Sequence, residues 1–341
     1  MSDGGAARSL LRPVSRRALL GASALGAALA GCGLRSAGRG GRPVTLMLDW
    51  YPNSDHAGIY AALDRGDFAA QGLDVTIQTP SATTDQIPLV AAGKADFAVS
   101  YEPDLLIARG QAVPVQAVFA VVQVPLNSVI ALTSSGITHP AQLQGRKVGT
   151  SGTPGDAVFL DAVVRADGGD PTKAQSINVG LDLVQSLIGH QVDAIVGGYW
   201  NWEAVEIGQE GDPVTVMRLE SWGVPTYDEL VIIAHAQAAA DLVTAFCAAL
   251  AAGTTYAVGH APQSLTQLLR ANSSLSKPLV QASLQLLQPA WQGSAPQVGY
   301  MDPKAWQAFA AWMVSEQWLP QAVDATQAMT DAHLPQAAAA G

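Results

Sequence analysis

The chain has 341 residues, of which 49% are apolar and 13% charged, and its formal net charge at pH 7 is −10. That length is enough for one large or two medium domains with a well-filled core. The acidic balance argues against binding nucleic acid or an anionic membrane surface through charge. With only two cysteines in the chain, a disulfide framework is excluded, and the hydrophobic core must supply the stability.

The first 31 residues predict export. Arg16 and Arg17 precede a 13-residue apolar run from Ala18 to Ala30, which is typical of a secretory signal and too short to span a bilayer. The paired arginines resemble a twin-arginine export signal, with the general route as the alternative. Leu29-Ala30-Gly31-Cys32 resembles a bacterial lipobox, which implies cleavage before Cys32 and a lipid on its sulfur. An ordinary signal with an incidental Cys32 is the other interpretation.

Cleavage before Cys32 changes the charge and leaves one cysteine in the body. It removes four arginines and one aspartate, and it leaves 14 basic and 27 acidic residues, a net charge of −13. Residues 32 to 42 then form a lipidated flexible tether rich in Gly, Arg and Ser. Cys247 has no intramolecular partner and is expected to be a small buried apolar residue. The predicted location is the outer face of the cytoplasmic membrane, with the protein anchored as a lipoprotein.

Short strands and helices alternate through the body, which predicts an α/β fold. Strands are predicted at residues 44–48, 74–78, 96–100, 113–123, 129–132, 147–150, 176–179, 192–196, 214–219 and 229–234. Helices are predicted at 86–92, 103–109, 154–167 and 181–188, with a helical turn at 140–144 and another helix starting near Trp200. Thr153 is predicted to cap the helix that Pro154 opens. Beyond Ala236 the chain is predicted to be mostly helical, interrupted at Pro262, Pro278 and Pro303.

Two segments echo each other and predict two similarly built lobes. Residues 90–99 and 187–196 each run from a helix end through Gly to an Asp that opens an apolar strand. We expect lobe 1 at 43–128 plus 235–332 and lobe 2 at 129–234, with a disordered tail at 333–341. The chain then crosses between the lobes twice, and the cleft between them is the expected small-molecule site.

The segment from Leu48 to Tyr60 is the strongest candidate for part of that site. It follows a predicted strand and precedes a helical pattern, and it gathers Asp, Trp, Tyr, Asn and His within a few positions. In open α/β sheets, ligands bind at such strand ends. The alternative is that Trp50 and Tyr51 are core aromatics and that Pro52-Asn53 is a plain turn.

A family resemblance rests on this segment and on three others. Asp49-Trp50-Tyr51-Pro52-Asn53-x-x-His56, Gly66-Asp67-Phe68, Gly93-Lys94-Ala95-Asp96-Phe97 and Gly197-Gly198-Tyr199-Trp200-Asn201-Trp202-Glu203 resemble the thiamine-precursor branch of bacterial ABC-importer substrate-binding proteins. That branch is similar to the nitrate, sulfonate, taurine and riboflavin binders and to a eukaryotic pyrimidine-precursor synthase. The resemblance, which runs from residue 43 to about 236, implies a two-lobed type II periplasmic-binding-protein fold with a hinge of two crossovers. It also implies capture of a formylaminopyrimidine or hydroxymethylpyrimidine and delivery to ABC permease subunits, with the aromatics and the glutamate at 199–203 holding the pyrimidine.

The chemistry of an aminopyrimidine suggests which residues would hold it. Its flat π-face, amine donor and ring nitrogen match aromatic walls and a carboxylate or amide edge. No Arg or Lys occurs in 49–60, 100–104, 151–156 or 197–206, whereas nitrate or sulfonate sites usually recruit them. The candidates are the aromatic walls Trp50, Tyr51, Tyr60, Tyr101, Tyr199, Trp200 and Trp202, the carboxylate Glu203, the polar partners Asn53, His56, Glu102 and Gln123, and the backbone of Gly152.

Several candidates also have a purely structural interpretation. Trp200 and Trp202 diverge if they lie on one helix, so one of them is expected in the core. Glu203 and Glu102 can each favour a helix start, His56 can hydrogen-bond locally, and Gly152 can belong to an ordinary turn. Another heteroaromatic ligand such as riboflavin, or nitrate, sulfonate or taurine, is the alternative within the binding class.

An enzymatic function is not expected. The chain lacks HExxH, paired CxxC, Gly-Lys-Ser/Thr and nucleophile-elbow motifs. The related synthase carries a cysteine-rich segment, whereas no cysteine lies between 33 and 246 here. We therefore predict a monomeric solute-binding protein with no cofactor or metal.

Overall fold

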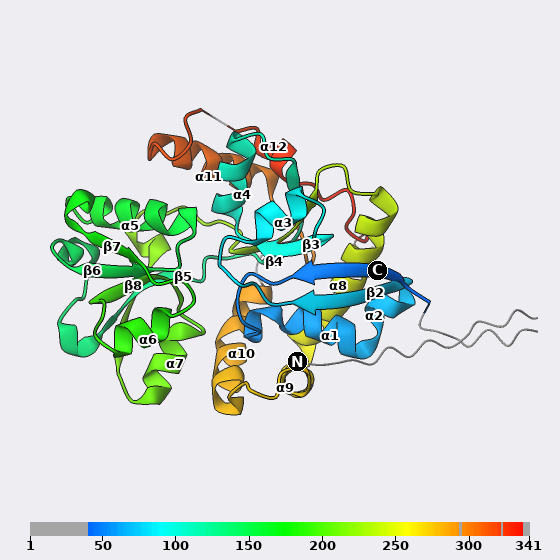
Figure 1. Cartoon of the computed structure of the whole chain (residues 1–341), viewed down its shortest axis with the longest axis horizontal. Helices are drawn as coiled ribbons and strands as arrows, with labels where there is room; N and C mark the ends of the chain where they lie inside the picture. The colour runs from blue at the N-terminus through cyan, green and yellow to red at the C-terminus, as the bar shows by residue number, and fades with distance from the viewer. Residues whose placement is uncertain (1–39, 293–294, 322, 337–341) are drawn as a thin grey trace, which may run out of the picture. The chain divides into compact units, whose positions relative to one another are not determined.

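Two five-stranded sheets organise the body of the protein (Figure 1). The computed structural model describes residues 40–292, 295–321 and 323–336. The first sheet has the order β2-β1-β3-β10-β4 and the second the order β7-β6-β8-β5-β9. The strands of the first sheet are β1 (Arg42–Met47), β2 (Leu73–Gln78), β3 (Phe97–Ser100), β4 (Val115–Val122) and β10 (Leu230–His235). Those of the second are β5 (Asn127–Leu132), β6 (Lys147–Thr150), β7 (Gln175–Asn178), β8 (Ala194–Tyr199) and β9 (Val214–Arg218).

Both sheets share one plan. In the first, β1 pairs in parallel with β2 and β3, and β10 runs antiparallel between β3 and β4. In the second, β6 pairs in parallel with β7 and β8, and β5 runs antiparallel between β8 and β9. Parallel neighbours need a helical connection, so the parallel strand ends point toward one edge of each sheet. This repeated plan explains the sequence echo between the two halves.

Helices cover both sheets and share the core with the strands. Those that follow strands of the first sheet are α1 (Ala57–Arg65), α2 (Asp67–Ala70), α3 (Gln86–Ala91) and α4 (Glu102–Gly110), preceded by the 3-10 turn η1 (Ser54–His56). The second sheet carries α5 (Pro154–Ala166), α6 (Leu183–Ile188) and α7 (Glu203–Glu210), with short 3-10 turns η2 (Thr133–Ser135), η3 (Pro140–Leu143), η4 (Pro171–Lys173) and η5 (Leu219–Trp222). The C-terminal helices are α8 (Ala240–Gly259), α9 (Ala261–Ala271), α10 (Lys277–Gln292), α11 (Pro303–Ser315) and α12 (Ala325–Ala328).

The boundary between the lobes differs from the expected one. Residues 229–234 were predicted to end lobe 2, but Leu230–His235 forms β10 in the first sheet, where its side chains up to Ala234 are fully buried between β3 and β4. Asn127 and Ser128 were predicted in lobe 1, but they open β5 in the second sheet. We call the first sheet with α1–α4 and α8–α12 the first lobe, and the second sheet with α5–α7 the second lobe. The chain crosses between β4 and β5 and again between η5 and β10.

The predicted helical C-terminal part is confirmed, and the three prolines predicted to interrupt it open helices instead. Pro262, Pro278 and Pro303 lie in the first turns of α9, α10 and α11, where a missing N–H costs nothing. Thr153 occupies the N-cap of α5 as predicted, but its side chain makes no capping bond.

Helix α8 is the one described helix that is long and apolar enough to cross a membrane. It is nevertheless a core helix, because Phe246 and Leu250 are fully buried and Cys247 is buried as a free thiol, as predicted. It crosses α1 so closely that a Cβ on Gly253 would lie 2.5 Å from the carbonyl oxygen of Gly58. Glycine is therefore required at this crossing.

The chain ends fall largely outside the described part. The leader, the lipobox cysteine Cys32 and most of the tether lie outside the described residues, as do residues 337–341 of the predicted tail. Residues 333–336 of that tail are described, and His333 Nδ1 hydrogen-bonds Thr244 Oγ1 at 2.9 Å. This bond ties His333 to α8, and the disorder expected for residues 333–341 stays a prediction.

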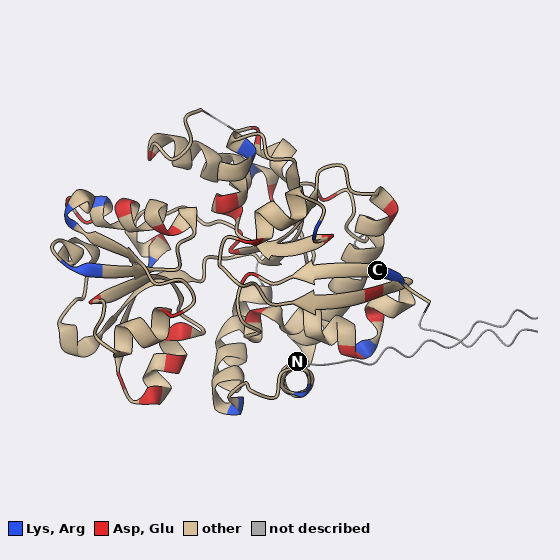
Figure 2. Cartoon of the chain, viewed as in Figure 1, with Lys and Arg blue, Asp and Glu red and all other residues tan. Residues whose placement is uncertain are grey.

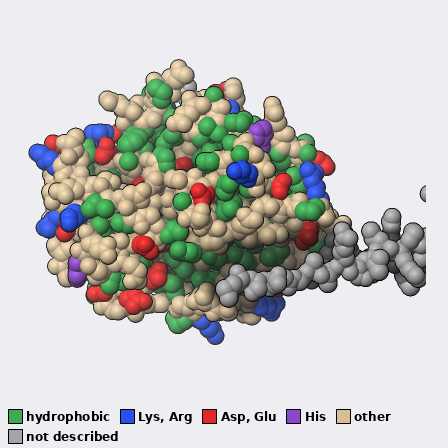
Figure 3. Space-filling model, viewed as in Figure 1, with side chains coloured by type: hydrophobic (Ala, Val, Ile, Leu, Met, Phe, Trp, Pro, Cys, Tyr) green, Lys and Arg blue, Asp and Glu red, His purple; other side chains and the backbone are tan. Residues whose placement is uncertain are grey.

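Charged residues are sparse and mixed over the described surface. Figure 2 shows acidic residues on helices of both lobes, with fewer basic ones between them. On the face drawn in Figure 3, Lys and Arg side chains lie apart from one another and form no basic patch. This face offers no continuous surface for a polyanion.

Candidate functional site

Strand ends from both lobes meet at a cleft. The loops after β1 and β3 reach it from the first lobe, and those after β6 and β8 from the second. The free space within it is about 30 Å³ in this arrangement. Its described lining consists of Asp49, Trp50, Asn53, Tyr101, Pro103, Asp104, Asn127, Ser151, Thr153, Gly155, Asp156, Phe159, Gly197, Tyr199, Glu203 and Glu229.

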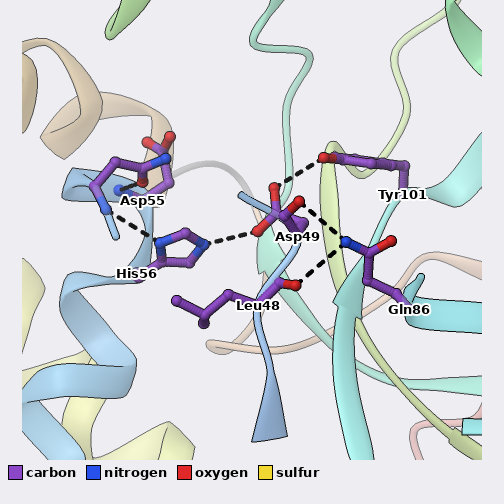
Figure 4. A network of polar contacts seen from close by, with 7 residues as sticks. Leu48, Asp49, Asp55, His56, Gln86 and Tyr101 are labelled. Carbon is purple, nitrogen blue, oxygen red and sulfur yellow. Dashed lines mark hydrogen bonds and ion pairs between the residues drawn. The ribbon is translucent and has the colours of Figure 1, made fainter. Parts of the chain in front are cut away.

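Asp49 is the centre of a hydrogen-bond network on the first-lobe wall (Figure 4). His56 Nε2 lies 2.7 Å from its Oδ1, and the hydroxyl of Tyr101 donates to its Oδ2 at 3.0 Å. His56 Nδ1 accepts the backbone N–H of Asn53 at 3.2 Å, so the proton of a neutral imidazole lies on Nε2 and points at Asp49. Gln86 Nε2 donates to the backbone oxygens of Leu48 and Asp49. The network fixes the loop that carries Trp50.

Asn53 begins the turn that follows. Its side-chain oxygen accepts the N–H of Asp55 at 2.9 Å, which with the His56 contact completes a capping box at η1. Capping of this kind satisfies backbone donors that a helix start leaves free. Asn53 thus lines the cleft and also shapes the loop.

Asp156 is the corresponding carboxylate on the second-lobe wall. It lies in the first turn of α5, and its Oδ2 accepts the N–H of Ser151 at 2.7 Å and the hydroxyl of Ser151 at 2.6 Å. β8 approaches it at Gly197, whose φ is +94° and where a Cβ would lie 2.8 Å from Asp156 Oδ1. Asn127 Oδ1 accepts the N–H of the same glycine at 2.9 Å.

Glu203 opens α7 just beyond β8. Its Oε2 accepts the backbone N–H of Tyr199 at 2.7 Å, and the residue is 5% exposed. The hydroxyl of Tyr199 is buried and has no hydrogen-bond partner among the described residues. This corner therefore combines a carboxylate, an aromatic ring and an unused hydroxyl.

Glu229 and Asp104 lie where the lobes meet. Glu229 Oε2 accepts the N–H groups of Leu126 and Asn127 at 2.7 and 2.8 Å, which ties one crossover to the other. Asp104 Oδ1, on α4, accepts the N–H of Gly155 on α5 at 2.8 Å. Both carboxylates therefore hold the lobes in the observed arrangement.

The electrostatics of the cleft favour a ligand that donates hydrogen bonds or carries a positive charge. Burial raises the pKa of Asp156 to about 6, of Asp104 and Glu229 to about 7, and of Glu203 to about 8. Among the described lining residues none is Lys, Arg or His, so no cation compensates these carboxylates. A ligand that brings N–H groups or positive charge would offset their desolvation.

A second interlobe contact lies beside the cleft. Asn201, which follows β8, donates through Nδ2 to Asp55 Oδ1 at 2.7 Å and to Ser283 Oγ at 3.3 Å. Ser54 and Ser283 share a further bond at 2.5 Å. Burial raises the pKa of Asp55 to about 7. These groups come from η1 and α10 of the first lobe and from the second lobe, so the cluster joins the two.

The structure brings five of the predicted site residues together. Trp50, Asn53, Tyr101, Tyr199 and Glu203 all line the cleft. They come from the ends of β1, β3 and β8, as expected for an α/β sheet. Their contact with a ligand stays a prediction.

The remaining first-lobe candidates lie elsewhere. Tyr51 is 51% exposed with its ring edge-on to Trp50, and Tyr60 is a core residue of α1. His56 is fully buried and positions Asp49. Glu102 and Gln123 line a separate cavity, where Gln123 Nε2 donates to the carbonyl oxygen of Tyr300.

The remaining second-lobe candidates are structural. Trp202 is buried in the core, and Trp200 donates to the carbonyl oxygen of Pro125 under the guanidinium of Arg218. We expected one of these tryptophans to face the cleft, but neither lines it. Trp202 packs in the core, and Trp200 contacts the first crossover at Pro125. Gly152 has a φ of +87° and packs against Asn178, so its role is that of a turn.

Sequence reasoning missed most of the other lining residues. Asp104 and Asp156 lie in the first turns of α4 and α5, directly after strand ends, and that position was a usable signal. Asn127 and Glu229 lie at the crossovers, and no local pattern marks them. Only the folded arrangement of the two sheets brings them to the cleft.

Comparison with known proteins identifies the family. A family model described as NMT1/THI5 like matches residues 53–264. The formylaminopyrimidine-binding protein of Halalkalibacterium halodurans is 36% identical over 298 residues, covering 84% of this chain and 90% of that protein. A putative thiamine biosynthesis protein of Haemophilus influenzae is 32% identical, covering 82% and 89% of the two chains.

Solved structures confirm the predicted two-lobed periplasmic-binding-protein fold. The alkanesulfonate-binding protein SsuA of Xanthomonas axonopodis pv. citri has a TM-score of 0.68 at 15% identity, covering 84% of this chain and 98% of that one. At that identity the likeness concerns the fold alone. The sequence matches go further, and the chain belongs to the NMT1/THI5-like family.

Proposed function

We propose that this protein is the solute-binding component of an ABC importer and that it captures a pyrimidine precursor of thiamine, of the formylaminopyrimidine or hydroxymethylpyrimidine type. The observation that carries the proposal is the cleft, where aromatic rings and carboxylates from both lobes meet without a described Lys or Arg. An aminopyrimidine offers a flat ring and N–H donors, which match such walls. Nitrate, or the sulfonate group of an alkanesulfonate or of taurine, would bring negative charge against these acidic side chains.

The relative named for binding formylaminopyrimidine supports the ligand class. It aligns with most of both chains, which supports a binding function for this chain and not an enzymatic one. In the proposed complex Glu203 accepts N–H groups of the pyrimidine, while Trp50 and Tyr199 lie against the ring. The ligand contacts both lobes and so stabilises their closed arrangement.

The sequence supports the proposed location and partners. The leader and the Leu29-Ala30-Gly31-Cys32 motif favour export and a lipid on Cys32, so that a monomer tethered to the outer face of the cytoplasmic membrane delivers its ligand to permease subunits. Cells grown with a labelled fatty acid are expected to incorporate the label into the wild-type protein and not into the Cys32→Ser variant. A wild-type protein without label, or equal labelling of the variant, would contradict the lipid anchor.

A thermal-shift panel tests the ligand. The mature protein is heated with formylaminopyrimidine, hydroxymethylpyrimidine, thiamine, riboflavin, nitrate or taurine, and we expect the two pyrimidines to raise the melting temperature most. Glu203→Gln should abolish most of that shift, whereas Glu206→Gln, on the same helix but outside the cleft lining, should preserve it. Stabilisation by nitrate or taurine alone would overturn the assignment.

A further inference from the structure

Four fully buried side chains between the lobes hold one another by hydrogen bonds. Ser54 and Asp55 belong to η1 and Ser283 to α10, all in the first lobe, whereas Asn201 follows β8 in the second. We call these four residues the interlobe cluster. None of the described lining residues of the cleft belongs to it. The cluster can therefore act on ligand binding only through the arrangement of the lobes.

The interlobe cluster is short of hydrogen-bond donors. Asn201 Nδ2 donates to Asp55 Oδ1 at 2.7 Å and to Ser283 Oγ at 3.3 Å, which uses both of its hydrogens. Two acceptors remain, because Asp55 Oδ2 and Asn201 Oδ1 are buried and have no hydrogen-bond partner among the described residues. Buried acceptors without a donor are costly and uncommon in native proteins.

A proton on Asp55 supplies the missing donor. A protonated carboxyl group has one O–H to donate and keeps an oxygen that accepts. A primary amide has the complementary pair of atoms, so an acid and an amide can share two hydrogen bonds side by side. In the first the amide N–H donates to one carboxyl oxygen, and in the second the carboxyl O–H donates to the amide oxygen. An ionised Asp55 can form only the first of these bonds with Asn201.

The first lobe brings no compensating positive charge to Asp55. His56 is its neighbour in the chain, but His56 Nδ1 accepts the N–H of Asn53, so this ring is neutral. The described elements packed against η1 are α1, α10 and β4, and β4 carries no titratable side chain. The titratable side chains of the two helices are Tyr60, Asp64 and Arg65 on α1 and Lys277 on α10. Arg65 pairs with Asp67, and Lys277 is exposed at the start of its helix.

The second lobe adds acidic groups. Glu203 and Tyr199 lie near enough for charge on Asp55 to raise their pKa, after the larger effect of burial. Burial raises the pKa of Asp55 itself from its ordinary value of 3.8 to about 7, and the charge of Asp49 adds to this. A charge on His56 would oppose it, but that ring is neutral. The Asn201 amide and the Ser54 hydroxyl oppose it in part.

We propose that Asp55 is a positioning residue that takes up a proton from solvent when the lobes close and donates it to Asn201 Oδ1. The proton returns to solvent when the lobes separate and water reaches the carboxyl group. The proposal rests on the proposed function, because it makes pyrimidine binding, which closes the lobes, depend on pH. Closure takes up a proton between the pKa of the open and the closed arrangement, so affinity falls as pH rises. With a closed-state pKa of about 7, Asp55 alone should weaken the affinity about tenfold between pH 6 and pH 8.

Calorimetric titration of the mature protein with formylaminopyrimidine at pH 6 and pH 8 tests the proposal. Asp55→Asn has an amide N–H where the proton lies, and its ratio of affinity at pH 6 to affinity at pH 8 should be about tenfold smaller than that of the wild type. Asp241→Asn, whose side chain is 83% exposed on α8, should keep the wild-type ratio. All three proteins share the acidic residues of the cleft, so the difference between them isolates Asp55. In buffers of different ionisation enthalpy at pH 6, Asp55→Asn should take up about one proton less than the wild type on binding.

An Asp55→Asn protein with the wild-type affinity ratio, or with the same proton uptake, contradicts the proposal. If this variant does not fold, Asp55→Ser is measured in its place, because serine is also uncharged and has an O–H donor. A wild type that binds neither pyrimidine at either pH refutes the proposed function instead, and closure is then followed by small-angle X-ray scattering of the unliganded proteins. A wild type that is more compact at pH 6 than at pH 8, with no such change in the variant, supports the proton on Asp55. No change in the wild type, or an equal change in both, contradicts it.

Discussion

Asn201→Ala tests whether the two lobes must come together for ligand binding. Asn201 is fully buried and donates to Asp55 and Ser283 across the interlobe boundary. Separation of the lobes exposes these groups to water, so the two bonds exist only when the lobes are together. The asparagine does not line the cleft, so its loss does not remove a ligand contact.

The size of the effect follows from the bonds that are lost. Removal of a buried hydrogen-bond partner costs about 1–3 kcal/mol. Here that cost destabilises only the closed arrangement, because the bonds are absent when the lobes are apart. If ligand binding requires closure, the dissociation constant for formylaminopyrimidine should rise about 5- to 150-fold. Gln288→Ala is the matched control, because Gln288 Nε2 donates to the carbonyl oxygen of Val258 at 3.2 Å within the first lobe.

Isothermal titration calorimetry measures both variants, with thermal unfolding recorded in parallel. We expect Asn201→Ala to lose affinity and Gln288→Ala to lose only stability. An Asn201→Ala protein that binds formylaminopyrimidine as tightly as the wild type would refute the reasoning, because the interlobe bonds would then contribute nothing to the bound state.

Three further predictions concern stability. His56→Ala leaves Asp49 and the N–H of Asn53 without their buried histidine partner. It should lower the free energy of unfolding, measured by chemical denaturation, by about 2–5 kcal/mol. A loss below about 1 kcal/mol would show that the network does not stabilise the fold. Gly253→Ala places a Cβ 2.5 Å from neighbouring atoms of α1 and should cost about 1–3 kcal/mol, whereas Gly259→Ala, which meets nothing within 4 Å, should not destabilise. Because burial raises the pKa of Glu203 to about 8, the folded state binds more protons than the unfolded state between the two pKa values, and stability falls as pH rises. The unliganded protein should therefore melt at a higher temperature at pH 5 than at pH 8, and a melting temperature that rises with pH would contradict this sign.

The secondary structure could be predicted well because glycine and proline mark its ends. Helix α3 ends at Ala91, and Gly93, whose φ is +66°, follows its C-cap residue. Pro154 opens α5, so local chemistry identified both boundaries. Sheet membership was harder to predict. Leu230–His235 reads as an apolar strand from its sequence, but nothing local shows that it pairs with β3 and β4 rather than with the second sheet.

The site could be predicted only in part, for a similar reason. Glu102 and Asp104 lie two residues apart on α4, and both are acidic residues after a strand end. The sequence favoured Glu102, yet Asp104 lines the cleft and Glu102 lines a separate cavity. Residues two apart on a helix point in different directions, and only the docking of the second lobe decides which of them meets Gly155.

A crystal structure of the mature protein with formylaminopyrimidine tests the central claim most directly. The account predicts one pyrimidine between the lobes, with its amine against the carboxylate of Glu203 and its ring against Trp50 or Tyr199. A pyrimidine bound outside the cleft, or a bound ring that makes no contact with Glu203 or either aromatic side chain, would contradict it.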